Sequence, residues 1–274
     1  MYPVLLPPHP ALQPFIHHYV YTCVGVAGQW SDFGMVPPGC TALPVTMGGR
    51  EVWLKADDEP ARKFESVAFS GQGTYFRKIS INDRFDVFFV IFKPCGAFQL
   101  LGAGQHGCVN DMFNLSDLLG GKVARNLRQQ LEDSTTARKT RSIIEQFLLQ
   151  RLLQQKNTDM VRQFDEISKK IKRESQEPLL VKKMCREEGV SKSKLERQMK
   201  EIVGMGPKQF QRIARFNAML SHIQQQADRR PWTEIAYQFG YYDQAHFIKE
   251  FKLFYGKTPT AYSTNDEILT NIAH

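Results

Sequence analysis

The sequence predicts an α+β region of about 150 residues, with a small sheet or barrel and some helices, followed by an all-α region. Up to about residue 110, short apolar runs alternate with turns rich in Gly, Pro and Asp, which is typical of short strands. Beyond Asp111, apolar residues recur at steps of three and four, as on amphipathic helices. Within the helical region, the same residue pattern occurs twice, which indicates two copies of a single structural unit.

The composition is that of an ordinary globular protein. The chain has 274 residues, and its 36 Lys and Arg against 28 Asp and Glu give a formal charge of +8. With 23% charged and 42% hydrophobic residues, a disordered or collagen-like chain is excluded. The N-terminus lacks the basic region of a signal peptide, and the longest apolar run, residues 87–92, is too short for a membrane span. We therefore expect a cytoplasmic protein with no membrane partner.

The cysteines and histidines indicate no metal or cofactor. The cysteine count is odd and no pair has C-x-x-C spacing, so we expect reduced thiols without a zinc site. The thiols are Cys23, Cys40, Cys95, Cys108 and Cys185. His17, His18 and His106 are not clustered with other ligands, so no metal site is expected there.

The predicted elements suggest a domain boundary. Five apolar runs predict strands, namely TALPVTM, EVWLKA, ESVAFSG, FRKISI and DVFFVIF. Helices are expected over residues 115–131 and 143–153, and the polar stretch 154–159 is the candidate linker. We therefore expect an N-terminal domain over residues 1–157 and a helical domain over residues 164–263. Paired helices in the first domain are a candidate homodimer interface. Its many aromatic residues either line a ligand pocket or fill a sandwich core.

The repeated pattern predicts two helix-turn-helix units, at about residues 179–203 and 233–254. The first copy has Cys185, Gly189, Leu195, Met199, Gly204, Pro207 and Phe210. The second copy has Ala236, Gly240, Phe247, Phe251, Gly256, Pro259 and Tyr262. The first glycine of each copy suits the left-handed turn that ends a helix, and Ser191 or Asp243 suits the N-cap of the next. In such a unit the second helix lies in the DNA major groove.

The charge distribution is consistent with a nucleic-acid partner. Residues 169–215 contain 14 basic and 6 acidic side chains, a balance of +8 that equals the charge of the whole chain. A basic stripe of this kind favours a partner that carries phosphate groups, such as double-stranded DNA. A solvated helix face is the alternative that charge alone leaves open.

The two repeats resemble a known family. IAYQFGYYDQAHFIKEFKLFYGKTPTAY, residues 235–262, resembles the second helix-turn-helix of the AraC/XylS family of bacterial transcription regulators, and VKKMCREEGVSKSKLERQMKEIVGMGPKQF, residues 181–210, resembles its first. The resemblance covers residues 164–263. The departures are Cys185, Met199, Tyr241 and Ser263, where the family usually has Ala, Phe, Phe and Arg. The first three are tolerable core changes, whereas Ser263 removes a phosphate contact.

The resemblance implies an arrangement and a set of DNA contacts. A central helix over about residues 208–226, with Arg212 and Arg215 outside, would present both recognition helices to major grooves roughly 34 Å apart. The expected base-facing residues are Ser193, Glu196, Arg197, Gln244, Ala245, Ile248 and Lys249. The expected phosphate-binding residues are Ser191, Lys192, Lys194, Lys200, Arg212 and Lys252. Arg197 is expected to bind guanine, with an ion pair to Glu201 as the alternative. Tyr241, Tyr242 and His246 are expected to pack or cap.

We therefore predict a sequence-specific DNA-binding transcription regulator, not an enzyme, controlled through its N-terminal domain by a small molecule or by dimerisation. The segments FKPCGAF and DLLG resemble the N-terminal domain of some AraC-like regulators whose effectors are mostly unknown. One alternative is a DNA-binding enzyme such as an alkyl-DNA repair protein, with Cys95 or Cys108 as nucleophile. Another is a ligand sensor whose helical half binds protein.

Overall fold

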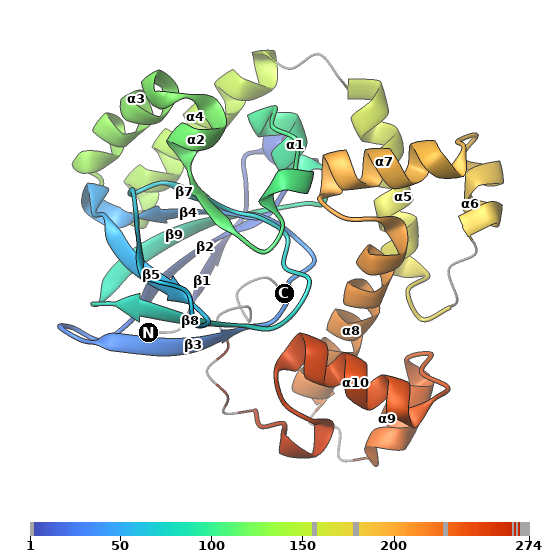
Figure 1. Ribbon diagram of the computed structural model, residues 1–274. Coiled ribbons are helices and arrows are strands. Elements are labelled where there is room, and N and C mark those ends of the chain that lie inside the picture. Colours follow the sequence, from blue (N-terminus) through green and yellow to red (C-terminus); the bar gives the residue numbers. More distant parts are fainter. Residues whose placement is uncertain are drawn as a thin grey trace.

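The computed structural model describes residues 3–154, 158–177, 181–226, 230–264, 266 and 268. A β-rich half is followed by a helical half, as the sequence predicts (Figure 1). Of the predicted linker, residues 155–157 lie outside the described residues, as do positions 179 and 180 of the first predicted helix-turn-helix. In the described portion of the chain, no helix has the length and apolar character needed to cross a membrane.

The β-rich half contains two antiparallel sheets. The strands are β1 (Val4–Leu6), β2 (Ile16–Val24), β3 (Trp30–Met35), β4 (Ala42–Thr46), β5 (Val52–Ala56), β6 (Arg62–Phe64), β7 (Ala68–Ser70), β8 (Arg77–Asn82), β9 (Phe85–Phe92) and β10 (Met112–Asn114). The larger sheet has the order β1-β2-β9-β4-β7-β10, and the smaller sheet has the order β3-β8-β5-β6. The five predicted strands are confirmed as β4, β5, β7, β8 and β9.

The packing of β9 explains its uninterrupted apolar run from Val87 to Phe92. Side chains alternate between the faces of a strand. Phe88, Val90 and Phe92 belong to the core between the larger sheet and the helices, whereas Val87 and Phe89 pack in the cluster between the two sheets. Because both faces of β9 are covered, polar residues have no place in its centre.

Four helices accompany the sheets: α1 (Gly96–Leu101), α2 (Leu115–Leu119), α3 (Gly121–Glu132) and α4 (Ala137–Gln154). Helices α3 and α4 cover the larger sheet, with Leu127 and Leu148 buried against it (Figure 1). The single helix predicted over residues 115–131 is wrong, because the chain breaks at Gly120. That residue has φ 83° and ψ 150°, outside the helical region and favourable only for glycine.

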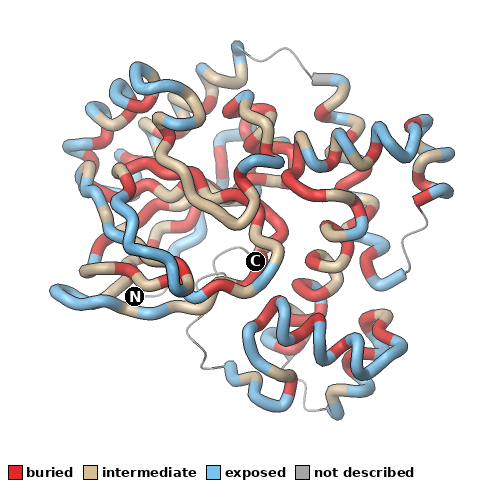
Figure 2. The backbone as a smooth tube through the Cα atoms, viewed as in Figure 1, coloured by how far each residue is buried: buried red, intermediate tan, exposed pale blue. Residues whose placement is uncertain are grey.

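The helical half has one shared core. Its helices are α5 (Thr158–Arg173), α6 (Val181–Glu187), α7 (Lys192–Val203), α8 (Pro207–Gln226), α9 (Trp232–Gln238) and α10 (Gln244–Tyr255). Phe164, Phe210, Phe216 and Phe251 are almost completely buried in it. Helix α8 runs between the two units, with α6 and α7 at one end and α9 and α10 at the other (Figure 1). Buried residues follow α8, and exposed residues cover the outer turns of both units (Figure 2).

The two halves are joined at equivalent positions of α7 and α10. The carbonyl oxygen of Glu201 accepts a hydrogen bond from the Gln105 amide at 2.8 Å, and that of Leu253 accepts one from the Phe76 amide at 2.8 Å. Glu201 and Leu253 each lie six residues after the first buried residue of their recognition helix, Leu195 and Phe247. The last carbonyls of a helix lack intrahelical partners, so loops of the β-rich half satisfy one in each recognition helix.

Candidate nucleic-acid interface and inter-sheet cavity

The repeated spacing produces the same local geometry twice. Gly189 and Gly240 adopt φ values of 63° and 74°, which end α6 and α9. The Ser191 hydroxyl then accepts a hydrogen bond from the Lys194 amide at 3.2 Å, and the Asp243 carboxylate accepts one from the Ala245 amide at 2.8 Å. These N-caps start the second helix of each unit.

The outer face of α7 is exposed and basic. Ser191, Lys192, Ser193, Lys194, Arg197 and Lys200 are exposed, and Glu196 is partly exposed. Among the described residues, Arg197 has no hydrogen-bond or ion-pair partner. Glu201, its alternative partner, lies instead with its Oε2 3.3 Å from His106 Nδ1. The Arg197 guanidinium is therefore available to a ligand, and its role in base recognition stays a prediction.

The outer face of α10 carries less charge. Gln244, Ala245, Lys249 and Lys252 are exposed, together with Ile248, which is 37% exposed. Tyr242 is 72% exposed, and its ring packs against that of Tyr237 at the surface and not in the core. Tyr241 is buried as expected. The DNA-contacting roles of these α10 residues also stay predictions.

A buried carboxylate joins α10 to α8. The side chain of Glu250 is 1% exposed, and its oxygens accept hydrogen bonds from Arg212 Nε at 2.7 Å, Arg215 Nη2 at 3.0 Å and the Tyr241 hydroxyl at 2.7 Å. Burial raises the pKa of Glu250, but the hydrogen bonds from Arg212, Tyr241 and Arg215 outweigh burial and the pKa is lowered. The carboxylate is therefore ionised at neutral pH.

The arginine partners revise one expectation. Arg215 was expected on the outside of the central helix, which is wrong: its side chain is 14% exposed and its guanidinium lies 4.1 Å from the centre of the Tyr241 ring. The attraction of Glu250 and the ring face holds it inside. Arg212 keeps 36% of its side chain exposed while it binds Glu250, so its phosphate contact stays a prediction. Glu250 itself was missed, although its place between Phe247 and Phe251 on the inner stripe is a signal.

The candidate nucleophilic thiols lie in the core. Cys95 is 1% exposed and Cys108 is 5% exposed. Burial raises the pKa of the Cys95 thiol to about 12, and burial also raises the pKa of Cys108. Because the thiolate is the reactive form, neither site favours alkyl transfer. Within the described ranges, no group of three or more His, Cys, Asp or Glu is placed to hold a metal ion.

An apolar cavity separates the two sheets. It has a volume of about 130 Å³, and its walls include Val52, Leu54, Ile81, Val87 and Phe89. The cluster that contains Ile81 and Val87 joins the two sheets beside it, and a smaller buried cluster of Val20, Cys40 and Ile91 remains separate from it. At ~24 cal/mol per Å³, leaving this volume unfilled costs about 3 kcal/mol, which a ligand would recover in part.

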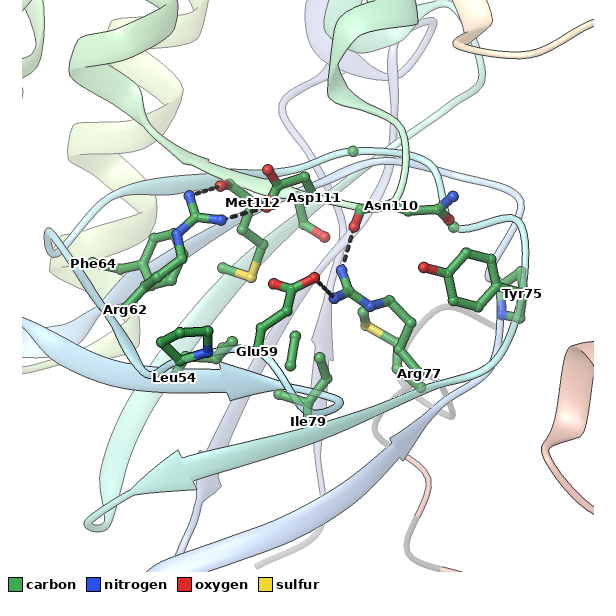
Figure 3. Close-up of a pocket in the computed structure, with 17 residues that line it drawn as sticks. Leu54, Glu59, Arg62, Phe64, Tyr75, Arg77, Ile79, Asn110, Asp111 and Met112 are labelled. Atoms are coloured by element: carbon green, nitrogen blue, oxygen red, sulfur yellow. Dashed lines mark hydrogen bonds and ion pairs between the residues drawn. The ribbon is translucent and has the colours of Figure 1, made fainter.

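A polar mouth adjoins the cavity (Figure 3). It contains Glu59, Arg62, Arg77, Asn110 and Asp111, and it shares wall residues such as Leu54 and Ile79 with the cavity. Arg77 binds Asp57 through Nε at 2.8 Å, Glu59 through Nη2 at 3.0 Å, and the Asn110 carbonyl through Nη1. Arg62 binds Asp111 at 2.7 Å and the Met112 carbonyl at 3.0 Å. Two arginines thus link the strands to the loop that carries Asn110 and Asp111.

The loops at the polar mouth are the ones that reach the recognition helices. Residues 71–77 contribute Arg77 to the mouth and the Phe76 amide to α10, and residues 105–111 contribute Asn110 to the mouth and the Gln105 amide to α7. The two loops also bind each other, because the Thr74 amide donates to the Asn110 side chain at 2.7 Å. The mouth and both recognition helices therefore belong to the same hydrogen-bonded network.

The family comparison agrees with the repeated geometry. Residues 184–265 match the model of a family described as a helix-turn-helix domain. The C-terminal portion of this chain is an AraC-type helix-turn-helix domain. The AraC-type domain makes the chain a DNA-binding transcription regulator, and proteins of this family are not enzymes. Residues 5–114 match a family described as a domain of unknown function, and no curated protein matches the sequence.

Solved structures of AraC-like proteins are similar in outline to this chain. ToxT from Vibrio cholerae is 12% identical with a TM-score of 0.48, and the alignment covers 89% of this chain and 97% of ToxT. A ToxT structure with a bound unsaturated fatty acid is 13% identical with a TM-score of 0.47, and the alignment covers 89% of this chain and 94% of that ToxT chain. The AraC-like transcriptional activator CuxR is 15% identical with a TM-score of 0.28, and the alignment covers 78% of this chain and 79% of CuxR. At these TM-scores, the assignment rests on the family match.

Proposed function

We propose that this chain reads a specific DNA sequence with α7 and α10 of its AraC-type domain, and that a small molecule in the inter-sheet cavity controls this binding. Residues 164–263 would bind DNA and residues 1–157 would act as the sensor. The observation that carries the proposal is the exposed basic face of α7, where Arg197 has no partner among the described residues and the second helix of a helix-turn-helix faces DNA.

The exposed residues divide into two roles. Arg197 would bind guanine through two hydrogen bonds, with Ser193 and Glu196 beside it, and Gln244 would bind adenine. Ala245 and Ile248 would contact thymine methyl groups next to Lys249. The phosphate contacts would come from Ser191, Lys192, Lys194, Lys200, Arg212 and Lys252. Because α7 carries more of these cations than α10, it would supply more of the affinity.

Control would pass through the polar mouth. A ligand that enters the cavity beside Arg77 and Asn110 must fit against the two loops whose amides bind Glu201 and Leu253. Because a ligand shifts an equilibrium only by its differential affinity for two states, the loops would have to differ between the free and the occupied cavity. The contacts at α7 and α10 would then differ as well.

Two further elements of the proposal concern assembly and place of action. Dimerisation through α3 and α4 stays a prediction, and sedimentation of the purified chain with and without DNA tests it. We also propose that the protein acts in the cytoplasm, where bacterial DNA lies; cell fractionation tests this.

The decisive experiment is selection of DNA fragments retained by the purified full chain, followed by their sequencing. On the selected site, Arg197→Ala should weaken binding by about 1–3 kcal/mol and relax one base preference. The matched control is Lys200→Ala, which should weaken selected and random DNA alike and reduce the salt slope by about 1. An equal loss on both DNAs for Arg197→Ala would contradict base reading, and no retention at low salt would favour a protein partner.

A further inference from the structure

We infer that the inter-sheet cavity takes a small uncharged apolar molecule and excludes anionic compounds of the same size. This inference rests on the proposed function, in which the cavity is the effector site. It adds the chemical class of the effector, because the walls and the polar mouth together fix which charges a ligand can carry.

The cavity interior offers a ligand mainly hydrocarbon. Val52, Leu54 and Phe89 line it and remain only half-buried, since they face the free volume instead of another side chain. The Glu65 carboxylate also lines it, with Arg128 as its ion-pair partner at 3.3 Å. Burial raises the pKa of the Cys40 thiol to about 11, so this wall group is neutral at physiological pH. A charged ligand group would therefore be desolvated here without compensation.

The cations of the polar mouth are already neutralised. Arg77 is bound through Nε, Nη1 and Nη2 by Asp57, the Asn110 carbonyl and Glu59, and Arg62 is bound by Asp111 and the Met112 carbonyl. Among the described residues that line the mouth or the cavity, Arg62 and Arg77 are the only cations. Figure 3 shows the Arg77 guanidinium turned toward Glu59 and the Asn110 carbonyl, and the Arg62 guanidinium turned toward Asp111 and the Met112 carbonyl. A carboxylate ligand would have to displace a protein carboxylate to reach either arginine.

The volume limits the size of the ligand. A dry apolar cavity of comparable volume accommodates benzene, so about 130 Å³ suits a ring with a short substituent, roughly six to ten non-hydrogen atoms. The dimensions and the mainly hydrocarbon walls thus favour compounds such as alkylbenzenes or aryl alcohols.

The test uses probes that share a ring and differ in charge: ethylbenzene, phenethyl alcohol and phenylacetate. Their binding to the full chain is measured by isothermal titration calorimetry at neutral pH. We expect the two uncharged probes to bind, and phenylacetate to bind at least about tenfold more weakly because its charge would be buried without a partner. Equal or tighter binding of phenylacetate overturns the inference, and so does the absence of binding by both uncharged probes at millimolar concentration.

A charge substitution at the mouth sharpens the test. Glu59→Ala releases Nη2 of Arg77, so phenylacetate should gain about tenfold in affinity while phenethyl alcohol is unaffected. The matched control is Asp58→Ala, which removes the neighbouring exposed carboxylate but leaves the partners of Arg77 in place. If Glu59→Ala and Asp58→Ala raise the affinity for phenylacetate equally, the gain comes only from the loss of a negative charge near the mouth. That result would overturn the role assigned to Arg77.

A filling substitution locates the probes. Val52→Phe places a ring in the cavity and should abolish binding of phenethyl alcohol, whereas Val26→Phe, at an exposed position away from the cavity walls, should leave it unchanged. Unchanged binding to a folded Val52→Phe variant overturns the location. Retention of the selected DNA is measured on the same preparations. If the unmodified chain retains the DNA but binds neither uncharged probe, this inference alone is overturned. If the unmodified chain does not retain the DNA, the proposed function is overturned.

Discussion

The two helix-turn-helix units share a spacing but are stabilised by different chemistry. Leu195, Met199 and Ile202 form an aliphatic inner face on α7, whereas Phe247, Phe251 and Tyr255 form an aromatic one on α10. Equivalent positions also differ in polarity. Glu250 on α10 has three close hydrogen-bonding partners, but its counterpart on α7 is Gln198, whose buried Oε1 has no partner among the described residues.

The comparison shows that the two units keep the same backbone geometry while the chemistry of their side chains differs. The glycines, N-caps and buried i, i+4 pairs set the helix-turn-helix path in both units. The side chains that fill the core and those that face solvent differ between the two units. The first unit carries the larger outward charge, and the second has the more elaborate attachment to α8. Both accept a hydrogen bond from the β-rich half at the same position.

The largest expected effect compares the two cores directly. Phe251→Ala should destabilise the protein by about 4 kcal/mol and Met199→Ala by about 3 kcal/mol, because a buried ring leaves the larger cavity. Chemical denaturation of both variants measures the two values. A larger loss for Met199→Ala would show that the aliphatic core, not the aromatic one, dominates.

The next effect isolates the buried carboxylate. Glu250→Gln should cost about 3 kcal/mol in free energy of unfolding, since two arginines lose their charged partner in the interior. The matched control is Glu234→Gln in the exposed first turn of α9, where we expect a change within about 0.5 kcal/mol. Similar losses for both would mean that the Glu250 network contributes little net stability.

The same carboxylate predicts a pH dependence of the second unit. The pKa of Glu250 is lowered in the folded state, so its contribution is complete above the unfolded pKa of about 4.3 and is lost as pH falls through the folded pKa. The protection of amides against exchange, relative to their intrinsic exchange rates at each pH, should therefore fall in α10 before α7 as the pH drops below about 4. The Glu250→Gln variant should lose this difference, and simultaneous loss of protection in both helices of the unmodified protein would contradict it.

A smaller effect concerns the contact of α7 with the β-rich half. Gln105 has φ −88°, close to what proline adopts, so Gln105→Pro removes the amide donor with little strain and should cost about 1 kcal/mol. Gln105→Ala keeps the donor and serves as the control. Faster amide exchange in the last turn of α7 in the proline variant alone is the expected readout.

The smallest effect is at the neighbouring ion pair. His106 is 70% exposed where it approaches Glu201, so His106→Ala should change the free energy of unfolding by no more than about 0.5 kcal/mol. A larger loss in thermal unfolding would show that the side-chain pair, and not the Gln105 amide, joins the two halves at α7.

The strands show which elements could be predicted from the sequence and which could not. Runs such as DVFFVIF are predictable because their apolar character is continuous. Strand β2 was missed, and its register shifts between Ile16 and His18, which interrupts the alternation that marks a strand. The break at Gly120 was missed because the apolar stripe continues across it, and a pattern of side chains does not report the φ of a glycine.

The sequence by itself determined the α+β and all-α division and the doubled helix-turn-helix, because glycine turns, N-caps and i, i+4 pairs act within a few residues. It also placed the basic face on α7. Only the tertiary structure decided that Glu250 meets Arg212 and Arg215, that the sheets leave a cavity, and that Arg77 meets Asn110 beside it. These contacts join residues far apart in the chain, so they depend on how packed elements meet and not on any local spacing.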